Sequence, residues 1–123
     1  MSHLVAIIED DETISQMYSY KLQASGFQTI AAFNGEQGLK ICEAHKPDLI
    51  LLDLRMPVMN GDEMLQKLRE TEWGSTMRVI VLTNISKDEA PRSLGLLWID
   101  RYIVKAHHTP QQIVDIIKEV IKL

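Results

Sequence analysis

The sequence has 123 residues and a mass of 14.0 kDa, and 46% of its residues are hydrophobic, which predicts one packed domain over residues 1–123. The formal net charge of −4 excludes a broad basic surface for direct contact with nucleic acid. Short apolar runs, no signal-peptide pattern and a single cysteine predict a cytoplasmic protein without membrane contact or an internal disulfide.

The chain alternates short apolar runs with longer stretches in which apolar residues recur every three or four positions. This alternation predicts a βα repeat, because a continuous apolar run is typical of a parallel strand covered by helices on both faces. The two less apolar runs should lie nearer the edges of the sheet. In chain order the expected strands are Leu4–Ile8, Gln28–Phe33, Leu49–Leu52, Val79–Leu82 and Tyr102–Val104.

Helices are expected after each of these strands, and most of them have clear signals at their ends. The first helix carries its apolar residues on one stripe. The second, third and last helices are expected to begin at the N-caps Asn34, Asn60 and Thr109. The helix before the last strand has weaker support, because Pro91 must lie in its first turn and Gly95 lowers helix propensity.

Polar side chains terminate four of the apolar runs. Glu9 and Asp10 follow the first run, Asp53 follows the third, and Thr83 and Lys105 close the fourth and fifth. In an open doubly wound sheet the ligand site lies beyond the carboxyl ends of the strands. We therefore expect these side chains to form one site at that edge.

The charges of these residues indicate the chemistry of the site. Two carboxylates about 4 Å apart repel by roughly 4 kcal/mol at an effective dielectric constant of 20, which is costly for a purely structural role. Mg²⁺ relieves such repulsion, and it takes one or two carboxylates together with water and phosphate oxygens. Asp53 stands alone after a central strand and is placed to attack phosphorus and form an acyl phosphate, whereas the adjacent Glu9 and Asp10 suit metal binding.

Together these residues resemble the receiver domain of bacterial two-component response regulators. The resemblance covers the whole chain, without insertion or deletion, and it rests on Glu9-Asp10, on Asp53-Leu54-Arg55-Met56-Pro57 through Gly61, on Thr83 and on Lys105. It implies an α/β, flavodoxin-like (βα)5 fold, doubly wound around a five-stranded parallel sheet in the strand order 2-1-3-4-5.

The resemblance also implies the phosphoacceptor and the cofactor. Asp53 would take a phosphoryl group from a sensor histidine kinase or from a small phosphodonor. Mg²⁺ would be held by Asp10, Asp53 and the main-chain carbonyl of Arg55, and Glu9 would act through a metal-bound water. The chain is then a phosphoacceptor switch that catalyses only its own phosphorylation and dephosphorylation, rather than an enzyme.

The remaining site residues are implied to transmit the signal. Lys105 would bind a phosphoryl oxygen, and Thr83 would swing toward the phosphoryl group. Tyr102 would follow Thr83 and reshape the face made by the fourth helix, the fifth strand and the last helix, although plain packing explains Tyr102 equally well. The implied partners are a histidine kinase or phosphotransfer protein, a downstream protein, and a second copy in a homodimer, because no output domain is expected within residues 1–123.

Departures from the family pattern keep other functions open. Ala106 stands where most of the family has proline, and Arg101 replaces an acidic dimer contact of one branch. These changes motivate the alternative of a receiver-like module that binds partners without phosphorylation, whereas the intact set of Asp53, Thr83 and Lys105 counts against it. A phosphatase with Asp53 as nucleophile is disfavoured, because Arg55 occupies the position of the usual second acid. A flavin carrier is also disfavoured, because the acidic run after the first strand would repel its phosphate. Trp98 anchors an interface if it is exposed and packs in the core if it is buried.

Overall fold

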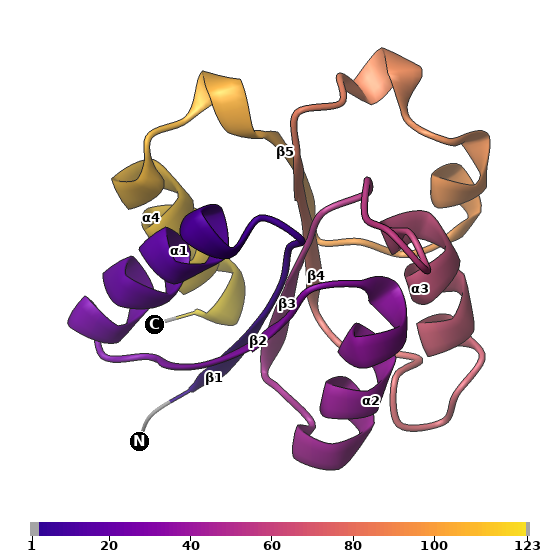
Figure 1. Ribbon diagram of the computed structural model, residues 1–123, viewed down its shortest axis with the longest axis horizontal. Coiled ribbons are helices and arrows are strands. Elements are labelled where there is room, and N and C mark those ends of the chain that lie inside the picture. Colours follow the sequence, from indigo (N-terminus) through magenta and orange to yellow (C-terminus); the bar gives the residue numbers. More distant parts are fainter. Residues whose placement is uncertain (1–2, 123) are drawn as a thin grey trace.

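One parallel sheet runs through the middle of the protein (Figure 1), which the computed structural model describes over residues 3–122. Its strands are β1 (Leu4–Ile8), β2 (Gln28–Ala32), β3 (Leu49–Leu52), β4 (Val79–Thr83) and β5 (Arg101–Val104). All neighbouring strands are parallel and follow the order β2-β1-β3-β4-β5. The predicted doubly wound, flavodoxin-like fold is therefore confirmed.

Helices cover both faces of this sheet. One face carries α1 (Glu12–Ala24) and α4 (Pro110–Ile121), and the other carries α2 (Gly35–His45) and α3 (Gly61–Arg69) (Figure 1). Within residues 3–122, none of the helices combines the length and the apolar character that crossing a membrane requires.

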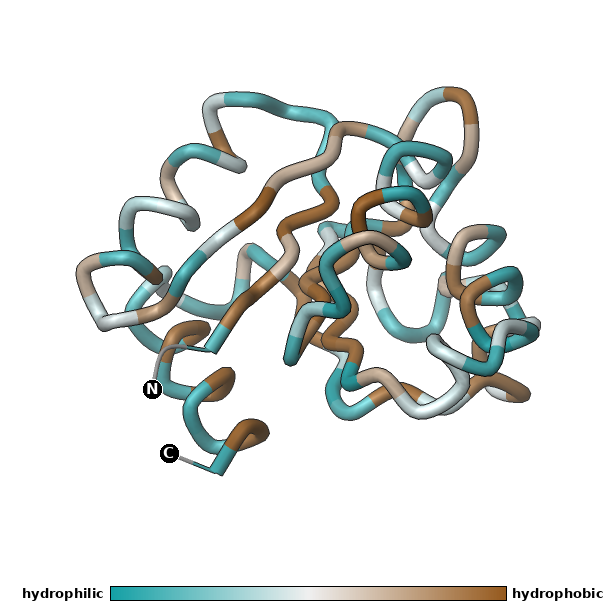
Figure 2. The backbone as a smooth tube through the Cα atoms, turned by 90° about the horizontal axis from the view of Figure 1, so that it is seen from below, coloured by the Kyte–Doolittle hydropathy of each residue, from teal (hydrophilic) through white to brown (hydrophobic). Residues whose placement is uncertain are grey.

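The sheet divides the apolar core into two clusters, because successive residues of a strand point to opposite faces. In β1, Val5 and Ile7 pack with α1 and α4, whereas Ala6 and Ile8 pack with α2 and α3. Figure 2 shows brown, hydrophobic strands between helices in which brown and teal alternate. Each buried Val, Leu or Ile side chain contributes about 1.5–3 kcal/mol. All residues of β3 and β4 are buried, so these strands firmly position the residues that follow them.

The predicted caps place the helix starts beside the carboxyl ends of the strands. Asn34, Asn60 and Thr109 each accept a hydrogen bond from the backbone N–H three residues later. Asp11 caps α1 in the same way, which gives this acidic residue a local structural role. The partly positive helix N-termini therefore lie at the same edge of the sheet as the strand ends.

The segment between β4 and β5 differs from the prediction. Instead of an α-helix it contains two short 3-10 turns, η1 (Lys87–Glu89) and η2 (Arg92–Leu96). Ala90 has φ −65° and ψ 149°, the extended conformation that a following proline favours. Pro91 has no N–H to continue a helix, and Gly95 weakens the short stretch that remains. The predicted helix is therefore wrong, and turns form the surface beside β5.

Candidate functional site

The polar residues that terminate the strands meet at one edge of the sheet. Glu9 and Asp10 follow β1, Asp53 follows β3, Thr83 is the last residue of β4, and Lys105 follows β5. All five line one open cleft with a volume of about 590 Å³. The fold thus brings together, from four strands, the residues that the sequence analysis singled out.

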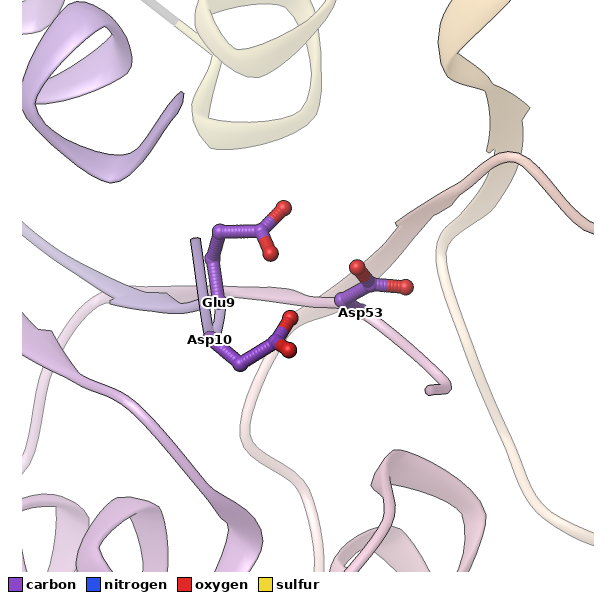
Figure 3. A group of neighbouring side chains, drawn as sticks. All are labelled: Glu9, Asp10 and Asp53. Atoms are coloured by element: carbon purple, nitrogen blue, oxygen red, sulfur yellow. The ribbon is translucent and has the colours of Figure 1, made fainter. Parts of the chain in front are cut away.

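Three carboxylates form the acidic centre of this cleft (Figure 3). One oxygen from each of Glu9, Asp10 and Asp53 lies within 4.8 Å of the other two. Glu9 is 5% exposed and Asp53 9% exposed, whereas Asp10 faces solvent. At an effective dielectric constant of about 20, two charges at this separation repel by roughly 3.5 kcal/mol. The acidic centre is therefore unfavourable until positive charge balances it.

Lys105 provides positive charge at this acidic centre. Its Nζ donates one hydrogen bond to Asp53 Oδ2 at 3.1 Å and another to Glu9 Oε1. Burial alone would lower the pKa of Lys105, but the hydrogen bond to Glu9 and the charge of Asp53 raise that pKa above its usual value. Burial raises the pKa of Glu9, and the hydrogen bond from Lys105 opposes this effect. The Lys105–Ala106 peptide bond is trans, as are all peptide bonds between described residues.

Two main-chain hydrogen bonds position Asp53, one to β1 and one from the turn that follows Asp53. The N–H of Asp53 donates to the carbonyl oxygen of Ile8 at 3.0 Å. The N–H of Arg55 donates a long hydrogen bond to Asp53 Oδ1 at 3.4 Å, and the exposed Arg55 side chain lines the cleft. The two carboxylate oxygens of Asp53 therefore have different partners, the Lys105 ammonium and a backbone amide.

Thr83 and Tyr102 both contact the chain just after β4. Thr83 is 1% exposed, and its Oγ1 accepts a hydrogen bond from the N–H of Ile85 at 3.4 Å. The Tyr102 hydroxyl donates to the carbonyl oxygen of Ile85 at 2.8 Å, and its ring lines a second groove of about 700 Å³. Burial raises the pKa of Tyr102, and the charges of Asp53 and Glu89 add to this. Ile85 joins the two residues, and no sequence signal marks it, because its backbone atoms make both contacts.

Trp98 is 53% exposed, and Arg69 contacts both its ring and its main-chain carbonyl. The Arg69 guanidinium lies 5.4 Å from the centre of the Trp98 ring and donates to the Trp98 carbonyl oxygen at 2.6 Å. The same guanidinium donates to the carbonyl oxygens of Gly74 and Met77. Arg69 therefore ties the end of α3 to the chain that leads into β5.

The donor set of the acidic centre fits a hard divalent cation such as Mg²⁺. The group consists of carboxylates, without a histidine or a cysteine among its members, whereas Zn²⁺ commonly takes nitrogen and sulfur ligands. Mg²⁺ usually keeps several waters and takes one or two carboxylates from the protein. The open cleft has room for such additional oxygens. The residues present therefore suit the cofactor that the sequence predicted.

Comparison with known proteins identifies relatives of this chain. The family model described as the response regulator receiver domain matches residues 5–118. The alkaline phosphatase synthesis transcriptional regulatory protein PhoP of Bacillus subtilis is 32% identical over 123 residues, which cover 99% of this chain and 50% of PhoP. The polar-differentiation response regulator DivK of Brucella anthropi is 29% identical over 111 residues, 90% of each chain. The chain thus spans about half the length of PhoP and of other transcriptional regulators that it matches.

The fold also matches a solved receiver domain that binds a metal. The receiver domain of the sensor histidine kinase PA1611 from Pseudomonas aeruginosa superimposes with a TM-score of 0.89 at 20% identity, and 100% of each chain is covered. That structure holds a magnesium ion coordinated in its active-site cleft. At this identity the likeness shows a shared fold.

Proposed function

The chain belongs to the family of response regulator receiver domains, and from that membership we propose that it accepts a phosphoryl group on Asp53 in two-component signalling. Receiver domains are signalling switches rather than classical enzymes. One observation carries the proposal: Asp53 shares an open cleft with two other carboxylates and with Lys105, whose Nζ lies 3.1 Å from Asp53 Oδ2. The carboxylate thus has a nucleophilic oxygen with a cation beside it.

The covalent step in this proposal is the transfer of one phosphoryl group. A carboxylate oxygen of Asp53 attacks phosphorus in line with the leaving group. A P–O bond to Asp53 forms while the bond between phosphorus and the donor breaks and its electrons stay with the donor. That bond is P–N in a phosphohistidine or in phosphoramidate, and P–O in acetyl phosphate or carbamoyl phosphate. Lys105 stabilises the charge on a phosphoryl oxygen. Dephosphorylation is a separate step, in which water attacks phosphorus, the P–O bond to Asp53 breaks, inorganic phosphate leaves and the Asp53 carboxylate is restored.

Four residues are proposed to serve the metal. Asp10, Asp53 and the carbonyl oxygen of Arg55 are the proposed ligands of Mg²⁺, and Glu9 is proposed to act through a bound water. When bound, Mg²⁺ supplies positive charge that offsets both the carboxylate repulsion and the charge of the phosphoryl group. Glu9 also keeps the Lys105 ammonium directed into the cleft through their hydrogen bond.

The proposed response to phosphorylation begins at Thr83 and Tyr102. A phosphoryl group adds negative charge and acceptor oxygens, to which the Thr83 hydroxyl would donate. Because Thr83 and Tyr102 both hold Ile85, a movement of Thr83 changes the backbone that Tyr102 contacts. The proposed output surface consists of residues 84–100, β5 and α4, where a downstream protein or a second copy would bind.

The proposed partners follow from this chemistry. A sensor histidine kinase or a phosphotransfer protein would supply the phosphoryl group to residues 1–123, which we propose to act as a single receiver domain. We also propose a cytoplasmic location, because the single cysteine, Cys42, is a buried free thiol, as is usual in reducing compartments. Direct contact with nucleic acid is not expected for a chain with a net charge of −4.

Acetyl phosphate with Mg²⁺ tests the proposal directly. We expect intact-mass spectrometry and a phosphate-affinity gel to show one base-labile phosphoryl group on the parent and none on Asp53→Asn. Equal labelling of Asp53→Asn would reject Asp53 as the acceptor. A parent that stays unlabelled with acetyl phosphate, carbamoyl phosphate and phosphoramidate would favour the module that binds its partners without phosphorylation.

A further inference from the structure

Gly61, the first residue of α3, lies directly against the backbone of Asp53. A Cβ atom on Gly61 would be 2.1 Å from the Asp53 carbonyl oxygen and 2.9 Å from its carbonyl carbon. The N–H of Gly61 also donates to the carbonyl oxygen of Leu54 at 2.9 Å. Helix α3 therefore begins in contact with the main chain that carries the proposed acceptor, and only the missing side chain of glycine permits this contact.

Gly35, the first residue of α2, holds the turn before α3 from its other side. The N–H of Gly35 donates to the carbonyl oxygen of Met59 at 2.8 Å, and a Cβ on Gly35 would be 2.6 Å from that oxygen. Within the turn, the N–H of Met59 donates to the carbonyl oxygen of Pro57 at 2.7 Å. This γ-turn centres on Val58, whose φ of 67° is rare for a β-branched residue. A turn that keeps such a strained residue must be firmly held.

We propose that Gly61 is a positioning residue for phosphoryl acceptance, because its contact with the Asp53 carbonyl fixes the main chain from which the acceptor carboxylate projects. This inference rests on the proposed function of Asp53. The hydrogen bond from the N–H of Asp53 to Ile8 already ties the residue to β1, and the start of α3 lies against the carbonyl group of Asp53. The orientation of the carboxylate toward Lys105 then depends on both restraints.

The size of the effect follows from the crowding that a methyl group at position 61 creates. Ordinary van der Waals contact begins at 3.4 Å, so a Cβ at 2.1 Å forces α3 and the Asp53 backbone apart by about 1 Å. The crowded atoms belong to the backbone, so no side-chain rotation relieves the overlap. A misplacement of about 1 Å costs roughly 100-fold in rate when reacting groups must align. We expect Gly61→Ala to lower the maximum phosphorylation rate about 10- to 100-fold.

The experiment compares Gly61→Ala with Gly74→Ala, its matched control. Gly74 is a buried glycine in the loop between α3 and β4, away from the cleft, where a Cβ would be 2.6 Å from the carbonyl oxygen of Leu68. Phosphorylation by acetyl phosphate at saturating Mg²⁺ gives the maximum rate and the half-saturating donor concentration separately, and urea unfolding gives the folded fraction. Folded Gly74→Ala should keep the maximum rate of the parent, whereas folded Gly61→Ala should lose it and should also shift the amide NMR signal of Asp53.

The outcomes separate this inference from the proposed function. A folded Gly61→Ala with the maximum rate of the parent overturns the positioning role, and so does an equal loss of rate in Gly74→Ala. If Gly61→Ala does not fold, Gly35→Ala crowds the same turn through Met59, and an unchanged rate in that variant overturns the inference. A parent that is never labelled rejects the proposed function itself, and the positioning role with it.

Discussion

Replacing Asp10 by Asn should stabilise the protein when no divalent cation is present. Asp10 has a carboxylate oxygen within 4.8 Å of one oxygen from each of Glu9 and Asp53. At this separation one pair repels by about 1 kcal/mol in a water-like dielectric and by about 3.5 kcal/mol at a dielectric constant of 20. Asp10 faces solvent, so the lower value applies, and the two pairs together amount to about 2 kcal/mol. Attraction to Lys105 reduces the expected gain to about 1–2 kcal/mol.

Thermal unfolding in EDTA measures this gain. For a domain of this size 1 kcal/mol corresponds to about 3–5 °C, so the Tm of Asp10→Asn should exceed that of the parent by roughly 3–10 °C. Asp88→Asn is the matched control, because Asp88 is also exposed and loses the same charge but lies outside the acidic group. The control should leave the Tm close to that of the parent.

Magnesium should reverse part of the difference between the two proteins. A ligand at ten times its Kd adds about 1.4 kcal/mol to the stability of a protein that binds it only when folded. The parent should gain this amount, and Asp10→Asn should gain less because it lacks one proposed ligand. A variant less stable than the parent in EDTA, or equal Mg²⁺-induced Tm shifts in both proteins, would refute the electrostatic reasoning.

Three other outcomes follow from single residues. Val58→Gly should raise the free energy of unfolding by about 1 kcal/mol, because glycine adopts a positive φ without strain. Val58→Ala should not raise it, so equal urea midpoints for the two variants would contradict this prediction. Burial raises the pKa of Cys42 to about 12. Its neutral thiol should therefore react with a chromogenic thiol reagent near pH 8 only after unfolding, and fast modification of the folded protein would contradict this prediction. Burial raises the pKa of Glu9 above 4.5, so the folded state holds this proton more tightly than the unfolded chain, and stability falls as the pH rises through the folded pKa. Glu9→Gln should therefore be more stable than the parent in EDTA near pH 7, and this difference in stability should disappear as the pH falls toward 4.5. A difference that stays constant over that pH range in urea unfolding would disprove the raised pKa of Glu9.

The sheet and the assembly of the acidic cleft were predictable because local signals and topology agree. A continuous apolar run such as Leu49–Leu52 is stable only with helices on both faces, and β3 begins and ends at the predicted residues. Once the strands are parallel, the residues after them share one edge of the sheet. The three acidic side chains and Lys105 therefore lie close together because each of them stands at or just after the end of a strand in the sequence.

The turn segment between β4 and β5 shows where periodicity misleads. Apolar residues continue through this stretch, but Pro91 keeps Ala90 extended, and only the five residues Arg92–Leu96 remain before the chain becomes extended again at Leu97. Helix nucleation fixes several residues for each hydrogen bond gained. A stretch this short therefore forms a 3-10 turn, and the proline should have outweighed the apolar pattern.

Contacts to backbone carbonyls could not be predicted in the same way. Tyr102 donates to Ile85, 17 positions earlier, and Arg69 donates to Trp98, 29 positions later. Each acceptor is a main-chain oxygen whose direction depends on the conformation of a loop, and every residue type offers such an oxygen. The contact of Gly61 with the Asp53 carbonyl could not be predicted either, because in the sequence Gly61 is only one residue of the motif that follows Asp53.

The two sides of Asp53 differ in how they can respond to a phosphoryl group. Such a group carries a charge of about −1.5 to −2 near neutral pH, which is more negative than the carboxylate that it replaces. Nearby polar groups must therefore rearrange or be neutralised. On the side of α3, the backbone of Gly61 lies so close to the Asp53 carbonyl that a Cβ atom would not fit between them. On the side of β4, Thr83 and Tyr102 hold Ile85 by single hydrogen bonds, and the chain beyond it forms short turns rather than a regular helix. On the proposed function, a charge change at Asp53 is therefore transmitted toward β5 rather than toward α2 and α3.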